Sequence, residues 1–82
     1  MMEQKELTPR QKQFLAMTSQ GKLHSQIAHE CGLSSETVRR TLTEARKRLC
    51  AQTTTQAAVL AIAREELGLD HDGFVYVPTM EI

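Results

Sequence analysis

Residues 25–49 read SQIAHECGLSSETVRRTLTEARKRL and contain the signals of two helices joined by a short turn. The first helix is expected from about Ser25 to Cys31. Its small apolar face holds Ile27, Ala28 and Cys31, at i, i+1 and i+4. Gly32 then supplies the chain reversal, and Leu33 is an apolar plug in the turn. This segment therefore predicts a short helix that reverses direction before a second one begins.

The second helix is longer, amphipathic and basic, and it is expected over about residues 34–49. Ser34 or Ser35 caps its start. Its apolar residues recur with the period of one helix face: Val38, Leu42, Ala45 and Leu49. Residues 39–48 hold five basic side chains against the single acid Glu44, and every one of these charges lies off the apolar stripe. The pattern predicts one buried face and one positively charged face.

A short helix, a glycine turn and a longer basic helix are typical of a helix-turn-helix motif, whose second helix enters the DNA major groove. That groove is about 12 Å wide and admits one helix. Side chains at i, i+3, i+4 and i+7 are the candidate base readers: Glu36, Arg39, Arg40 and Thr43. The next turns supply candidate phosphate contacts: Arg46, Lys47 and Arg48. The backbone N–H groups at Ser34 and Ser35 also point toward a phosphate.

Two further helices complete an all-α, four-helix prediction. Thr8-Pro9-Arg10-Gln11 predicts a capped helix start, and Gln20-Gly21 marks the end of that helix. Its apolar residues are Phe14, Leu15 and Met17. The last helix is expected from about Thr55 to Leu67, with Gly68 as its stop. Its core candidates are Ala58, Ile62 and either Leu67 or Leu69.

From Leu7 to Leu69 the chain resembles the DNA-binding domain of the LuxR/GerE group of bacterial regulators. The matching stretches are Leu7-Thr8-Pro9-Arg10, Gly21, Gln26-Ile27-Ala28, Leu33-Ser34, Thr37-Val38-Arg39, Leu42, Arg48-Leu49 and Gln56-Ala57. The resemblance implies four helices, with the third in the major groove. It also implies DNA contacts for Thr37, Val38, Arg39 and Lys47. Core or near-core positions are implied for Leu15, Ile27, Ala28, Leu33, Val38, Leu42 and Leu49.

The chain departs from the family pattern at four places. Gln11 replaces a usual glutamate, Thr41 a common histidine and Thr54 a frequent basic residue. Cys50-Ala51 replaces a glycine-valine pair after the third helix. The last change predicts a different end for that helix, and the loss of a basic residue removes one phosphate contact.

The last helix carries more apolar residues than one core face requires. Val59, Ile62 and Ala63 are the candidates for a dimer interface, and the resemblance also implies a two-fold contact through this helix. Packing against the first helix is the alternative. A homodimer would match an operator with two half-sites.

The zero net charge hides a division along the chain. Residues 1–64 hold all ten Lys and Arg against five acids, whereas residues 65–82 hold five acids and no Lys or Arg. Local charge governs attraction to a polyanion, so DNA remains the expected partner. The chain divides into a DNA-binding domain (1–69) and an acidic, aromatic tail (70–82). The tail is a disordered end, an arm packed on its own domain, or a segment that docks on another protein or mimics phosphate.

Other classes of function fit the sequence poorly. It contains no Gly-rich phosphate loop and no credible nucleophile–base set, so we expect no enzyme and no cofactor. Cys31, Cys50 and the three histidines have no zinc spacing, so we expect free thiols and no metal. No apolar run is long enough for a membrane span, no secretory signal is present, and a cytoplasmic protein is expected. Three roles remain: a DNA-binding regulator that also contacts RNA polymerase or another regulator, a module that sequesters such a regulator, and a promoter-recognising domain like that of a sigma factor.

Overall fold

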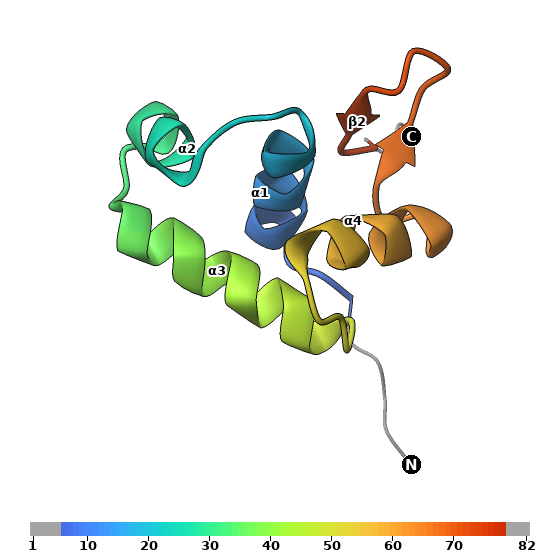
Figure 1. Cartoon of the computed structure of the whole chain (residues 1–82), viewed down its shortest axis with the longest axis horizontal. Helices are drawn as coiled ribbons and strands as arrows, with labels where there is room; N and C mark the ends of the chain where they lie inside the picture. Colours follow the sequence, from blue (N-terminus) through green and yellow to red (C-terminus); the bar gives the residue numbers. More distant parts are fainter. Residues whose placement is uncertain (1–5, 79–82) are drawn as a thin grey trace.

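The computed structural model describes residues 6–78. Four helices come first: α1 (Pro9–Ser19), α2 (His24–Cys31), α3 (Ser35–Arg48) and α4 (Thr54–Ala63). Two short antiparallel strands follow, β1 (Gly68–Leu69) and β2 (Val75–Tyr76), with Gly68 opposite Tyr76 and Leu69 opposite Val75. In Figure 1, α3 crosses the molecule, α2 and α4 lie toward its opposite ends, and α1 lies between them. The predicted fold of four helices is confirmed. The structure also contains a two-stranded hairpin after the helices.

The start of α1 follows its local sequence. The Gln11 N–H donates to Thr8 Oγ1 (3.1 Å), and the Thr8 N–H donates to Gln11 Oε1 (3.0 Å). Pro9 occupies the first turn, where its missing N–H removes no helical bond. Glutamine therefore completes this reciprocal cap as glutamate would.

Each of the four helices is followed, one or two residues after its end, by a residue with a left-handed backbone. These residues are Gly21 (φ +95°), Gly32 (+69°), Cys50 (+56°) and Glu65 (+64°). After α3, the Cys50 N–H donates to the Lys47 carbonyl (3.2 Å) and the Ala51 N–H to the Arg46 carbonyl (2.8 Å). This is the Schellman arrangement that glycine usually permits. Cys50 thus ends α3 in the same way as the glycines end α1 and α2, and the expectation of a different ending is wrong.

The fourth helix is shorter than its apolar pattern predicts. It begins with Thr53 as N-cap, whose Oγ1 accepts from the Gln56 N–H (3.0 Å), and it ends at Ala63. Gly68 is not its stop residue but lies in β1. A Cβ at Gly68 would clash with the Tyr76 ring, so the absence of a side chain lets the ring cover this strand.

The core lies where α1, α3 and α4 meet. Its largest fully buried side chains are Phe14, Leu15, Ile27, Val38 and Leu67. Six of the seven predicted core positions are buried, and the seventh, Leu33, is half-buried against them. Among the proposed core residues of the last helix, Ala58 and Leu67 are buried, whereas Ile62 is half-buried and Leu69 is exposed.

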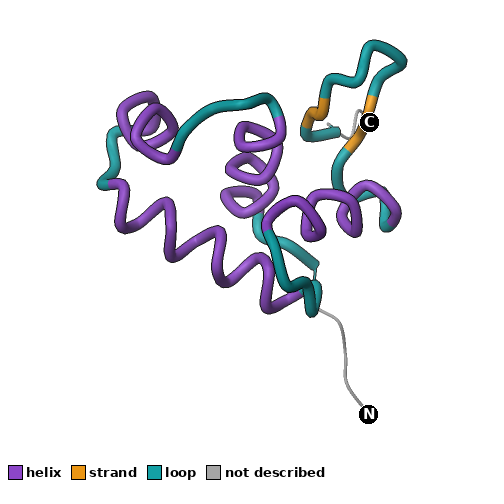
Figure 2. The backbone as a smooth tube through the Cα atoms, in the orientation of Figure 1, coloured by secondary structure: helices purple, strands orange, loops and turns teal. Residues whose placement is uncertain are grey.

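Residues 70–78 complete the hairpin, whose strand β2 packs against α1 while its loop projects away from the helices (Figure 2). The Asp70 carboxylate accepts from the Asp72 N–H (3.0 Å) and the Phe74 N–H (2.8 Å), which closes the hairpin loop. Val75 is buried with the core, and Gln20 Nε2 donates to its carbonyl (2.9 Å). The interpretation of the tail as a disordered end is therefore wrong for residues 70–78, and the hairpin joins residues on both sides of the expected boundary at 69/70. Residues 79–82 lie outside the described part.

Candidate nucleic-acid interface

α3 packs one face into the core and exposes the opposite face to solvent. Val38, Leu42 and Ala45 are buried on the inner face. At its start, Ser34 Oγ accepts from the Thr37 N–H (3.1 Å). α2 packs against α3, and its buried residues are Ile27 and Ala28. A rigid support of this kind fixes where the outer face of α3 points.

The predicted contact residues occupy three environments. Five are exposed: Ser35, Glu36, Arg39, Arg40 and Lys47. Four are half-buried: Thr37, Thr43, Arg46 and Arg48. Val38 is fully buried, so its side chain belongs to the core and not to the candidate contact set. The helical period places Val38 on the same buried stripe as Leu42, so its side chain does not face the solvent.

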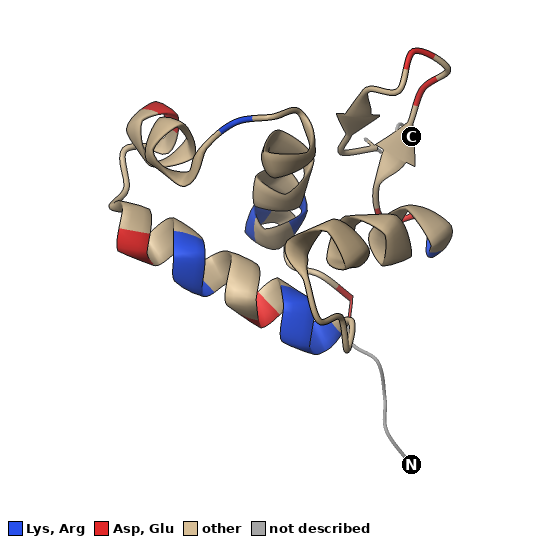
Figure 3. Ribbon diagram, viewed as in Figure 1, with Lys and Arg blue, Asp and Glu red and all other residues tan. Residues whose placement is uncertain are grey.

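The charges of α3 are ordered along its axis. Glu36 lies in the first turn, and Arg46, Lys47 and Arg48 lie in the last turn, an arrangement that complements the helix dipole. Basic positions follow α3 in Figure 3, whereas the acidic positions of the hairpin loop lie at the far side of the molecule. Arg48 Nη1 donates to the Glu6 carbonyl (2.7 Å), so this arginine ties the segment before α1 to the end of α3.

Glu36 and Arg39 form an ion pair one turn apart on the exposed face. Arg39 Nη2 donates to Glu36 Oε2 at 2.5 Å, and both side chains are about 60% exposed (59% and 61%). The hydrogen bond from Arg39, together with its positive charge, lowers the pKa of Glu36. The same bond and the carboxylate charge raise the pKa of Arg39.

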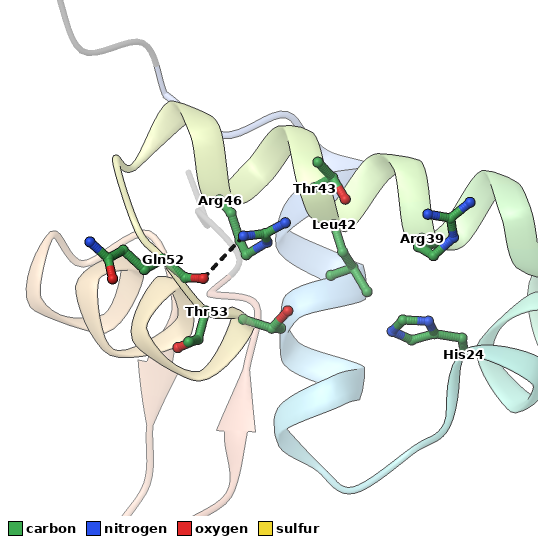
Figure 4. Close-up of a pocket in the computed structure, with 8 residues that line it drawn as sticks. His24, Arg39, Leu42, Thr43, Arg46, Gln52 and Thr53 are labelled. Carbon is green, nitrogen blue, oxygen red and sulfur yellow. Dashed lines mark hydrogen bonds between the residues drawn. The ribbon is translucent and has the colours of Figure 1, made fainter.

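A polar hollow of about 340 Å³ lies beside α3, between the starts of α2 and α4 (Figure 4). Its lining is His24, Arg39, Leu42, Thr43, Arg46, Gln52, Thr53 and Thr54. Arg46 Nη1 donates to the Gln52 carbonyl (3.1 Å), which holds that arginine at the hollow. Sequence reasoning missed His24, Gln52 and Thr53 because no spacing rule links them to α3, and only the fold brings them to it.

A second hollow, of about 310 Å³, lies between the end of α1, α4 and β2. Val59 lines it and is 59% exposed, Ile62 is half-buried and Ala63 is exposed. The hollow is lined by Thr18, Ser19, Thr54, Thr55, Ala58, Val59, Ile62 and Val75. The proposed dimer residues are thus accessible on the outer side of α4. Val75 of β2 lines the same hollow, so the hairpin contributes to this surface.

The cysteines are separate free thiols, Cys31 half-buried and Cys50 exposed. Within residues 6–78, no three His, Cys, Asp or Glu side chains come together as a metal site. None of the helices in that same range has the length and apolar character needed to cross a bilayer.

One comparison with known proteins identifies the helical part of the chain. The sequence model described as bacterial regulatory proteins, luxR family, matches residues 5–61. This match includes α1, α2, α3 and most of α4, and it ends before the hairpin. A search of the curated proteins found no match.

Proposed function

Because the chain belongs to the luxR family of bacterial regulatory proteins, whose helix-turn-helix domains bind DNA and regulate transcription, we propose that it recognises a specific double-stranded operator in the cytoplasm with α3 in the major groove. The observation that carries this proposal is the outer face of α3. That face projects basic and polar side chains, while Val38, Leu42 and Ala45 anchor the opposite face in the core.

The base-reading set lies in the first and middle turns of α3. Arg39 and Arg40 are exposed, and each has the paired donors that match guanine O6 and N7. Thr43 follows one turn later, where its hydroxyl reaches a base edge or a backbone oxygen. These side chains would give the sequence preference, because phosphate contacts carry none directly.

Phosphate contacts would come from both sides of these bases. Lys47 is exposed near the end of α3, and Arg46 lines the polar hollow with His24. The start of α4 at Thr53 adds free backbone N–H groups at the same hollow, and these groups favour an anion. A DNA strand crossing this hollow would therefore meet cationic side chains and a helix N-terminus together.

A homodimer through α4 fits this mode of binding. A two-fold interface uses the same patch on both copies, so a projecting side chain beside a hollow on one face is self-complementary. Val59 projects next to the hollow that Ile62 and Val75 line. Two copies would then present two α3 helices to half-sites spaced by about one DNA turn.

Fluorescence anisotropy with labelled promoter fragments at several salt concentrations tests the proposal. We expect tight binding to some fragments only, with affinity that falls steeply as salt rises, because phosphate neutralisation releases counterions. Equal affinity for every fragment would contradict specific recognition. Absence of binding at low salt would contradict DNA binding itself.

A second candidate function is a protein-interaction module that sequesters or redirects another regulator or RNA polymerase. The hairpin favours it, because Leu69, Phe74, Tyr76 and Val77 are all exposed on a segment outside the family match. Exposed aromatic residues are common anchors of protein interfaces. If Phe74→Ser and Tyr76→Ser together left regulation of a target promoter unchanged in cells, this candidate would be removed.

A further inference from the structure

The ion pair between Glu36 and Arg39 leaves the arginine able to bind a base. The contact joins a single guanidinium nitrogen, Nη2, to one carboxylate oxygen. A guanidinium carries five N–H donors, so others remain for guanine O6 and N7. Both side chains are largely exposed on the outer face of α3, where the groove would lie. The carboxylate therefore restrains Arg39 without consuming its capacity to read guanine.

The neighbouring arginine provides a contrast within the same helix. Arg40 is exposed like Arg39, but its side chain forms no ion pair or hydrogen bond with any residue from 6 to 78. A free arginine side chain loses rotamer entropy when it binds, and a restrained one has lost part of that freedom already. The side chain of Arg39 is thus restrained to one geometry before DNA binds, whereas the side chain of Arg40 keeps the freedom to adopt several rotamers.

Glu36 also changes the balance between specific and non-specific binding. A carboxylate near the DNA backbone is repelled by phosphates, so it weakens binding to every sequence by a similar amount. Glu36 offsets this loss of affinity only on a sequence where it holds Arg39 against the correct base. An acid at this position therefore increases the difference in affinity between the cognate operator and non-cognate DNA.

We propose that Glu36 is a positioning residue that holds Arg39 for guanine, so that each operator half-site carries a G·C pair beneath the first two turns of α3. This inference rests on the proposed DNA-binding function and names the base that the site selects. It differs from a direct role for Glu36 as an acceptor from cytosine N4, in which Arg39 would read its base independently of Glu36.

The experiment selects bound duplexes from a library with randomised half-sites, using the whole chain, and then measures affinity for the selected duplex and for single-base variants of it. Wild type is compared with Glu36→Gln, Arg39→Lys and the double variant. Glu44→Gln is the matched control, because Glu44 is an exposed acid on the same helix with no ion pair to any residue from 6 to 78. Circular dichroism checks that each variant is folded.

We expect wild type to prefer guanine at one half-site position by about tenfold or more, as one bidentate pair allows. Glu36→Gln should bind non-cognate duplexes about two- to fivefold more tightly and lose most of the guanine preference. Arg39→Lys should lose the same preference, and the double variant should lose little beyond either single change, because the two residues act as one unit. Glu44→Gln should strengthen binding to all duplexes alike and keep the preference.

Three results would overturn the inference, and each has a different meaning. If Glu36→Gln keeps the guanine preference of wild type, Glu36 does not position Arg39. If Glu36→Gln loses a cytosine preference while the guanine preference of Arg39 persists, Glu36 reads DNA directly. If folded wild type binds no duplex at low salt, the proposed function fails and the inference fails with it.

Discussion

Four single residues carry the left-handed backbone that ends the helices, and two of them are not glycine. A side chain in this conformation costs about 1–2 kcal/mol, whereas glycine costs extra entropy in the unfolded chain. We therefore predict that Cys50→Gly raises the free energy of unfolding by about 0.5–1 kcal/mol, measured by urea denaturation. Cys50→Ala is the control, because it removes the thiol and keeps the strained backbone. Equal stability of the two variants would show that Cys50 bears no such strain.

The exposed pair on α3 gives a prediction about pH. Because the pKa of Glu36 is lowered, its ion pair with Arg39 stabilises the folded state above the ordinary range of a glutamate pKa, about 4.3, and the stabilisation is lost as pH falls through the folded pKa. The pair therefore adds no pH dependence between about pH 6 and 8. NMR titration should find the Glu36 pKa higher in Arg39→Gln than in wild type. An unchanged value would mean that the pair does not form in solution.

At the scale of elements, the hairpin offers two valines in contrasting positions. Val75 is buried against the core, and Val77, two residues later, is exposed. We predict that Val75→Ala lowers the free energy of unfolding by about 1–2 kcal/mol, because a buried cavity forms. Val77→Ala should change it by less than about 0.5 kcal/mol. Thermal denaturation followed by circular dichroism measures both, and equal effects would contradict docking of the hairpin on the domain.

How far the sequence predicts each element depends on the range of its contacts. The start of α1 was predictable, because Thr8 and Gln11 satisfy each other three residues apart. The end of α4 was not, because it depends on distant partners. Glu66 is buried there and accepts from the Leu7 N–H (2.7 Å), 59 residues away in the chain. An apolar pattern that continues to Leu67 fits a longer helix equally well, so periodicity alone could not place the end.

Some residues of the candidate site were likewise predictable from local sequence, and others depend on contacts between distant parts of the chain. The spacing of Glu36, Arg39, Arg40 and Thr43 placed them on the outer face of α3, since helical period is a local property. The sequence left Val38 in both the core and the contact set, and only its burial assigns it to the core. The polar hollow required the fold, because His24 and Thr53 come from helices on either side of α3.

At the scale of the whole molecule, the proposed dimer depends on one exposed apolar side chain. We predict that Val59→Lys makes the protein monomeric in sedimentation at concentrations where wild type is dimeric, because a charge would be buried in an apolar interface. Affinity for DNA with two half-sites should fall, whereas affinity for a single half-site should persist. Gln13→Lys adds the same charge at an exposed position of α1 and serves as the control. If wild type is itself monomeric with and without DNA, α4 is not a dimer interface.

The separation of charge across the molecule explains how a chain of zero net charge can attract DNA. Each principal dimension is between 26 and 34 Å, which exceeds the screening length of about 8 Å at physiological salt. DNA at α3 therefore senses the local cations and little of the acidic hairpin. We predict that Lys47→Ala weakens binding to all sequences and lowers the slope of log affinity against log salt by about one. Asp72→Asn, in the hairpin loop, should leave that slope unchanged. A gain in affinity from Asp72→Asn would instead mean that the acidic hairpin competes with DNA phosphates for the basic face of α3. Because the hairpin loop lies away from α3 in its own chain, the competing hairpin would have to come from a second copy of the protein.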